Sequence, residues 1–97
     1  MLASMAFSSC NYDYINASGK IVTEKRQVAN FTGVSVSNDF EVEIKIGPVT
    51  EVMVEADDNV IEHIVTNVSG NMLKIRIDEF ISLNGAQLKV YITTPQL

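Results

Sequence analysis

Cys10 is the residue whose surroundings most directly predict a chemical modification. The sequence FSSC at positions 7–10 resembles a bacterial lipobox, in which small residues precede a cysteine whose thiol accepts a diacylglycerol. The preceding residues, MLASMAFSS, carry no charge and match the end of a secretory signal, although its positively charged start is missing. Residues 1–9 are therefore predicted to be a partial signal peptide and Cys10 a lipidated N-terminus. The alternative is an idle thiol in a frayed terminus.

The segment that follows Cys10 predicts a tether. Residues 10–18, CNYDYINAS, are mostly polar and show no apolar periodicity, which suits a short link between an anchor and a folded domain. Two or three acyl chains would hold the protein firmly on a membrane, whereas a single chain binds only weakly. We therefore expect a membrane to be a partner through the lipid anchor, with residues 10–18 as the lipidated N-terminus and tether.

Two carboxylates have the spacing of a hydrolytic pair. Glu41 and Glu43 alternate with apolar residues, so they share one face of a predicted strand and lie about 7 Å apart by strand rise. This separation is within reach of the paired carboxylates of glycosidases. Lys45 continues the same row, so a solvated charged face is the favoured interpretation. A carbohydrate-processing enzyme is the least favoured function.

The other candidates for metal binding or catalysis favour structural roles. His63 is the only histidine, and no serine or cysteine with a partner acid lies near it in the sequence. Asp57, Asp58 and Asn59 could offer oxygens to Ca²⁺, but the ligand spacing and central glycine of an EF-hand do not follow them. A helix N-cap explains these acids better. We expect no catalytic residue, no metal and no cofactor.

Aromatic residues could form a platform for a sugar. The candidates are Tyr12, Tyr14 and Tyr91. Two of the three fall in the predicted tether, so the sequence gives no reason for them to meet.

Composition restricts the partners and the class of protein. The 97 residues, 46% apolar and 20% charged, suit one domain and exclude a multidomain enzyme. A net charge of −5 leaves no basic excess for phosphates, so we expect no nucleic-acid partner. One cysteine excludes an internal disulfide, and a single histidine without a second thiol argues against a zinc site.

The elements that must position these residues are predicted to be strands. Alternation is clearest in FEVEIKI at 40–46, where Phe40, Val42, Ile44 and Ile46 share one face. The same period recurs at 34–37, 52–56, 73–78 and 88–93, and more weakly at 21–28. Many of these residues are Val or Ile, whose branched Cβ suits a pleated surface. The pattern predicts an all-β fold.

Turn signals separate these strands, and one short segment predicts a helix. Turns are expected at 38–39, 47–48, 69–71 and 84–85, and Asn84-Gly85 is the strongest hairpin signal. Residues 57–65, DDNVIEHIV, predict a helix of about two turns, capped by Asp57 or Asp58, which must pack on the sheet to be stable. An antiparallel β-sandwich or meander would accommodate these elements.

Several segments, taken in order, resemble the head GIN domain family of auto-transporter adhesins, which is common in lipoproteins of Bacteroidetes-type bacteria. GKIVTEKR at 19–26 and FTGVSV at 31–36 resemble its opening segment. FEV at 40–42 and VEADDN at 54–59 are similar to its second segment, and LKI at 73–75 and KVYITTP at 89–95 to its third and fourth. The resemblance covers about residues 19–97 and also implies an acylated cysteine just upstream, where Cys10 stands.

The resemblance implies a fold and a cellular setting. It implies that residues 19–97 are the N-terminal part of a right-handed β-helix-like solenoid, because family members continue with Ser-Gly-rich strand repeats that this sequence does not contain. It implies an outer-membrane lipoprotein of the bacterial cell envelope, facing the periplasm or the surface. The expected function is non-enzymatic adhesin-like binding of a surface polysaccharide or protein. The alternative is a structural assembly protein that self-associates through exposed β edges.

Overall fold

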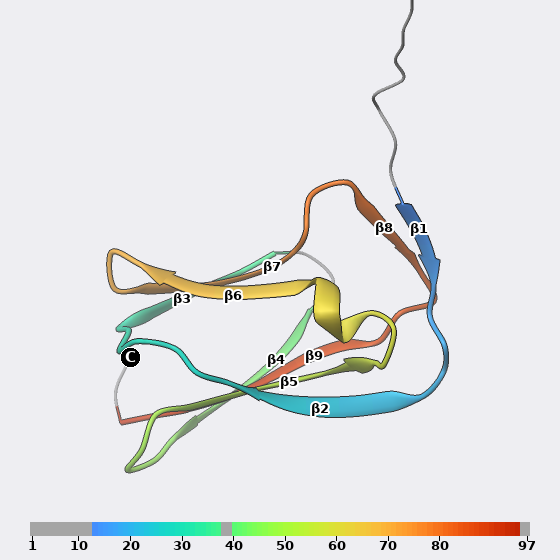
Figure 1. Ribbon diagram of the computed structural model, residues 1–97. Coiled ribbons are helices and arrows are strands. Elements are labelled where there is room, and N and C mark those ends of the chain that lie inside the picture. The colour runs from blue at the N-terminus through green and yellow to red at the C-terminus, as the bar shows by residue number, and fades with distance from the viewer. Residues whose placement is uncertain (1–12, 38–39, 96–97) are drawn as a thin grey trace, which may run out of the picture.

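The computed structural model describes residues 13–37 and 40–95, and these residues form an all-β fold (Figure 1). The elements in chain order are β1 (Asp13–Asn16), β2 (Ile21–Arg26), β3 (Gly33–Val36), β4 (Glu41–Ile46), β5 (Glu51–Asp57), the 3-10 helix η1 (Ile61–His63), β6 (Ile64–Ser69), β7 (Met72–Ile77), β8 (Ile81–Asn84) and β9 (Leu88–Thr94). The predicted all-β class is confirmed.

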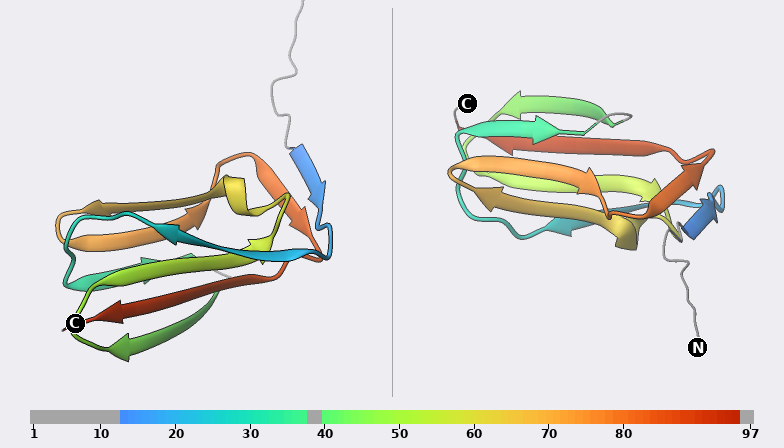
Figure 2. Two further views of the ribbon diagram at one scale, coloured as in Figure 1. Left: turned by 60° about the horizontal axis from the view of Figure 1, so that its bottom comes forward. Right: turned by 90° about the horizontal axis from the view of Figure 1, so that it is seen from above.

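The strands of the described residues form three open sheets. A four-stranded sheet with the order β2-β5-β9-β4 faces a three-stranded sheet with the order β3-β7-β6, and β1 pairs with β8 in a separate ribbon (Figure 2). The β1–β8, β3–β7 and β4–β9 pairs are parallel, whereas β2–β5, β5–β9 and β6–β7 are antiparallel. The two larger sheets are therefore mixed and the β1–β8 ribbon is parallel, unlike the sheets of a purely antiparallel sandwich or meander. The predicted solenoid stays a prediction.

The core lies between the two larger sheets and follows the predicted alternation. The most deeply buried side chains come from every second position of β5, β7 and β9, namely Val52, Val54, Leu73, Ile75, Val90 and Ile92, each at most 1% exposed. Residues with the opposite parity on β5 and β9 face away from this core. Period-2 patterning therefore assigned the inward faces of these central strands correctly.

Strand β4 has the expected parity but lacks the expected burial. Ile44 pairs with Ile92 of β9, and directly paired residues share a face of the sheet, so Ile44 points to the core side. It is nevertheless 46% exposed, and Ile46 is 65% exposed. The reason is position: β4 is the edge strand of its sheet, and its alternating pattern cannot indicate whether a further strand covers that edge.

The predicted helix at 57–65 is wrong over most of its length. Strand β5 continues to Asp57, only Ile61–His63 form a single 3-10 turn, and β6 begins at Ile64. The turn begins at Val60 without a side-chain cap, so Asp57 and Asp58 are not its N-caps. Antiparallel pairing of β6 with β7 satisfies more backbone groups than two isolated helical turns could, which explains why tertiary pairing prevails.

Arg26 ties this turn to strand β2. Its guanidinium donates to the backbone carbonyl oxygens of Ile61 and Ile64 at 2.9 and 2.8 Å, and its Nε is ion-paired with Glu24. The side chain is 17% exposed. An arginine with core-side parity, which weakens the strand pattern at 21–28, thus donates to two carbonyl oxygens at the η1–β6 junction, one of which also accepts from the Ile64 N–H.

The predicted hairpin at Asn84-Gly85 is also wrong, although the turn itself exists. Gly85 has a φ of 73° at the bend, but β8 and β9 do not pair with each other. Strand β8 instead pairs in parallel with β1, which lies within the predicted tether. Residues 13–16 of the predicted tether therefore form a strand, while the lipidated N-terminus upstream stays a prediction. By contrast, the turn at 69–71 closes the β6–β7 hairpin, with positive φ at both Gly70 and Asn71.

Candidate functional site

The outward surface of the four-stranded sheet is the best-organised polar surface in the described part of the chain. We call it the Tyr91 face, and it consists of Thr23 and Lys25 on β2, Glu51, Met53 and Glu55 on β5, Lys89, Tyr91 and Thr93 on β9, and Glu41, Glu43 and Lys45 on β4. No other described element covers it from below in Figure 1. It is therefore open to a ligand.

Strand register places Tyr91 at the centre of this face. Tyr91 lies directly opposite Met53 on one side and Glu43 on the other, because β9 is inserted between β5 and β4. Lys25 lies opposite Met53 and extends the same row. Side chains paired in this way stand on one face within contact range of each other.

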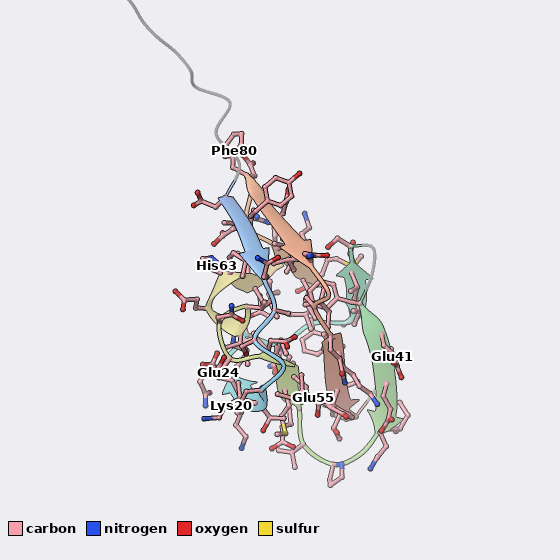
Figure 3. All side chains as sticks on the ribbon, turned by 90° about the vertical axis from the view of Figure 1, so that its right-hand side faces the viewer. Lys20, Glu24, Glu41, Glu55, His63 and Phe80 are labelled. Carbon is pink, nitrogen blue, oxygen red and sulfur yellow. The ribbon has the colours of Figure 1, made fainter. Side chains whose placement is uncertain are left out.

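Two neighbours hold the Tyr91 ring. The Lys89 ammonium lies 4.8 Å from the ring centroid, a cation–π distance, and the Tyr91 hydroxyl donates to a carboxylate oxygen of Glu55 at 3.3 Å. Lys89 is also ion-paired with Glu41 at 3.5 Å. In Figure 3, Glu55 and Glu41 mark the two sides of this arrangement, on β5 and β4.

The charge state of Lys89 is set by the same neighbours. Hydrogen bonding with the Tyr91 side chain raises the pKa of the Lys89 ammonium above its usual value, and the negative charge of Glu41 raises it further. A lysine is cationic at neutral pH at its ordinary pKa, and these neighbours stabilise that charge further.

A shallow hollow of about 320 Å³ opens beside the ring. It is lined by Glu43, Lys45, Glu51, Met53, Tyr91, Ile92 and Thr93. A second hollow of about 330 Å³ adjoins it and shares Glu51 and Thr93 with it. The first hollow is lined by Tyr91 itself, whereas the second extends to the loop at Val49 and Thr50.

The structure places Glu41 and Glu43 on this face, as the predicted solvated charged row. The Glu41 side chain is 75% exposed and its partner is the Lys89 ammonium. A general acid of a glycosidase needs a desolvated setting that keeps it protonated, and an exposed, ion-paired carboxylate lacks one. The pair is therefore better suited to binding than to hydrolysis.

His63 lies in η1 with an acid beside it that the local sequence did not reveal. Its Nδ1 is 4.0 Å from a carboxylate oxygen of Asp78, and its side chain is 26% exposed. The backbone N–H of Asp78 also donates to the His63 carbonyl oxygen at 2.9 Å. The two residues thus join the η1–β6 junction to the end of β7, a structural role.

The acidic run at 57–59 joins distant segments. The buried Asp57 carboxylate accepts from the backbone N–H groups of Gly19 at 2.9 Å and Gln87 at 3.0 Å. Asn59 accepts from the backbone N–H of Ser18 and donates to the Asn16 carbonyl oxygen. These oxygens are engaged within the protein, and the described residues contain no cluster of three metal-ligating side chains.

The tyrosines are not brought together, and Cys10 is not placed. Tyr14 lies on β1 and is 79% exposed, whereas Tyr91 lies on β9 in another sheet. Cys10, Tyr12 and the predicted signal residues 1–9 lie outside the described residues. No helix among the described residues is long and apolar enough to cross a membrane.

Sequence reasoning missed Lys89 and Glu55 as partners of Tyr91. Alternation indicated that all three face outward, but their proximity depends on β9 lying beside both β5 and β4. That strand order has no local sequence signal, so only the three-dimensional pairing reveals the cluster.

A family model described as "Putative auto-transporter adhesin, head GIN domain" matches residues 30–97. A search of the curated proteins gives no match.

Solved structures of similar fold include a putative adhesin from Bacteroides fragilis NCTC 9343 (TM-score 0.76, 24% identity, 86% of this chain covered). Another is a putative adhesin from Parabacteroides merdae ATCC 43184 (TM-score 0.76, 13% identity, 88% of this chain covered). A third is a putative lipid binding protein from Parabacteroides distasonis ATCC 8503 (TM-score 0.72, 20% identity, 88% of this chain covered). The chain spans only 39%, 36% and 38% of these three structures respectively. At such identities the likeness extends to the fold alone.

Proposed function

The chain belongs to the "putative auto-transporter adhesin, head GIN domain" family, and on that premise we propose that it is a non-enzymatic, adhesin-like binding domain of the bacterial cell envelope. The Tyr91 face is the observation that supports this proposal. It is an uncovered sheet surface with a fixed aromatic ring, adjoining hollows and several polar groups. Such a surface suits recognition of a large surface molecule, a polysaccharide or a protein, better than enclosure of a small substrate.

The proposal is tested by measuring binding and turnover together. The purified chain is immobilised and exposed to a panel of purified polysaccharides and extracellular-matrix proteins. We expect saturable binding to at least one member, with the size of the bound molecule unchanged after incubation. Failure to bind any member would contradict the binding role. Ligand hydrolysis that disappears in Glu41→Gln would contradict the non-enzymatic role.

We also propose that Cys10 anchors the protein to the outer membrane. The lipobox-like FSSC sequence and the family's envelope setting support this proposal. After expression in a Bacteroidetes host, the protein is expected in the membrane fraction, with an N-terminal peptide that begins at residue 10 and carries acyl chains. Mass spectrometry checks this, and Cys10→Ser should release the protein to the soluble fraction. An intact Met1 together with an unmodified Cys10 thiol would contradict the anchor.

Parallel strand pairs support the proposal that this domain is the start of a β-helix-like solenoid. Strands β7, β8 and β9 follow one another along the chain and pair in parallel with β3, β1 and β4 in three different sheets. Successive coils of a β-helix also pair in parallel, although each coil there repeats the chain order of the one before it, whereas β1 precedes β3 in this chain. The parallel pairing, and not the strand order, therefore supports the proposal. The open edges at β3 and β4 are where a further coil would add, and the solved structures of similar fold are longer than this chain.

The open edge of β4 favours a second candidate function, assembly through strand addition. Strand β4 combines an unpaired edge with the exposed apolar side chains Ile44, Ile46 and, just beyond it, Val49. Edges of this kind template pairing with another chain. Sedimentation velocity of the purified chain should then show oligomers at high concentration that Ile46→Lys dissociates, whereas Tyr14→Lys, which places a lysine at another exposed hydrophobic position on β1, leaves them intact. A monomer at all concentrations would contradict the assembly function.

A further inference from the structure

We infer that the Tyr91 face binds an uncharged polysaccharide chain, with the Tyr91 ring as its stacking platform. This inference rests on the proposed binding function and specifies its site and the chemical class of its ligand. Three observations support it: the ring is held in place, positive and negative side chains are interspersed around it, and the hollow beside it shares two lining residues with a second one.

The ring is organised before a ligand arrives. Lys89 contacts the ring and Glu55 accepts from its hydroxyl, so both the position and the rotation of the side chain are restricted. A side chain that is already ordered loses little further conformational entropy on binding. Tyrosine also combines an apolar ring, which can cover the C–H face of a pyranose, with a polar tip that stays hydrated or hydrogen-bonded.

The charges on the face favour a ligand without net charge. Lys25 is ion-paired with Glu51 at 3.0 Å, and Lys89 with Glu41 at 3.5 Å. Glu43 and Lys45 on β4 have opposite signs, and Glu55 accepts from the Tyr91 hydroxyl, so the face carries three positive and four negative side chains. A strongly anionic or cationic polymer would meet repulsion as well as attraction here, because like and unlike charges alternate across the strands.

The same groups are suited to hydroxyls. Carboxylates such as Glu43 accept hydrogen bonds from hydroxyl groups, and an ammonium such as Lys45 donates to them. Hydrogen bonds to charged partners are stronger than neutral ones, and several of them can compensate for the desolvation of a polyhydroxylated ligand. Met53 supplies an apolar surface directly beside the ring.

The shape of the face favours a chain of sugars over a single one. The hollow beside Tyr91 shares Glu51 and Thr93 with the second hollow, which lies at the end of the sheet beside the loop at Val49 and Thr50. A monosaccharide would occupy only one of the two hollows. A linear oligosaccharide could stack on Tyr91 and extend into the second.

Affinity electrophoresis of the purified 97-residue chain tests the inference, because it detects the weak binding typical of open surfaces. The native gels contain soluble neutral polysaccharides (β-glucan, mannan or galactan), anionic polygalacturonate, or no polymer. At least one neutral polysaccharide should retard the wild-type protein. Tyr91→Ala should weaken that retardation about tenfold or more in apparent Kd, the effect of removing a central aromatic contact. Tyr91→Phe keeps the ring and should stay within a few-fold of wild type.

A matched control separates the site from the fold. Lys74→Ala alters an exposed side chain on β7, in the other sheet, and should bind like wild type. Far-UV circular dichroism checks that each variant is folded. If neutral polysaccharides do not bind but polygalacturonate or a matrix protein does, the inference is overturned and the proposed binding function stands. Equal binding by Tyr91→Ala and wild type also overturns it. If no polysaccharide and no matrix protein binds, both the inference and the proposed function fail.

Discussion

Replacement of Ile92 by alanine is expected to lower the free energy of unfolding by about 2 to 5 kcal/mol. Ile92 is 1% exposed at the centre of β9, between β5 and β4, so the truncation removes buried methyl groups and leaves a cavity. A domain of this size has a total stability of about 5 to 15 kcal/mol. The loss should therefore appear as a large decrease in the midpoint of urea unfolding followed by far-UV circular dichroism.

Ile44→Ala is the matched control, because it makes the same chemical change at the residue paired with Ile92. Ile44 is 46% exposed at the sheet edge, so little apolar surface returns to water and no closed cavity forms. We expect a loss of about 1 kcal/mol or less. Equal losses at both positions would contradict the described burial of β4 and would indicate that another chain covers its edge.

Asp57→Ala is expected to cost about 2 to 4 kcal/mol, because two backbone donors lose a charged acceptor. The Asp57 side chain is 2% exposed and accepts from Gly19 and Gln87, which lie in the connections before β2 and before β9. Asp57→Asn keeps one acceptor oxygen and should lose less. Asp58→Asn, an exposed neighbour bonded to Ser18, should change stability by only about 0.5 kcal/mol. Equal losses for Asp57→Ala and Asp58→Asn would contradict the role assigned to Asp57.

Because Asp57 is ionisable, its contribution to the free energy of unfolding is expected to depend on pH. The hydrogen bond from the Gln87 N–H lowers the pKa of Asp57 below its ordinary 3.8; burial opposes this shift, and the Gly19 N–H contributes to it. A group with a lowered folded-state pKa stabilises the protein fully above its unfolded pKa, and that contribution is lost as pH falls through the folded value. Unfolding measured from neutral pH to about pH 2 should show this loss in wild type and not in Asp57→Asn. If the free energy of unfolding of wild type and of Asp57→Asn changed with pH in the same way, the predicted contribution of Asp57 would be contradicted.

Local alternation was a reliable guide to the central strands and to their faces. Val52, Val54, Val90 and Ile92 are buried as the period of two requires, because side-chain direction in a strand depends only on position along it. The head GIN resemblance, based on short segments in order, was confirmed by the match over residues 30–97. The all-β class followed from the same segments.

Local signals failed where two structures compete for the same residues. Residues 57–65 carry a helical pattern, but β5 extends through Asp57 and β6 begins at Ile64 because both find partner strands. Asn84-Gly85 carries a hairpin signal, but β8 pairs with β1, so that Asn84 bonds to Asn16 across 68 positions of the chain. Tertiary pairing outweighs such short local preferences.

The sequence by itself determined that the chain forms strands, which side of the central strands faces inward, and which residues are polar on the other side. These properties depend on neighbours one or two positions away. Only the tertiary structure decided that β9 lies between β5 and β4, which buries Ile92, leaves Ile44 at an edge and gathers Lys89, Glu55 and Glu41 around Tyr91. Several strands with the same alternating pattern can exchange places without any local change. The packing of the whole core selects one order among them.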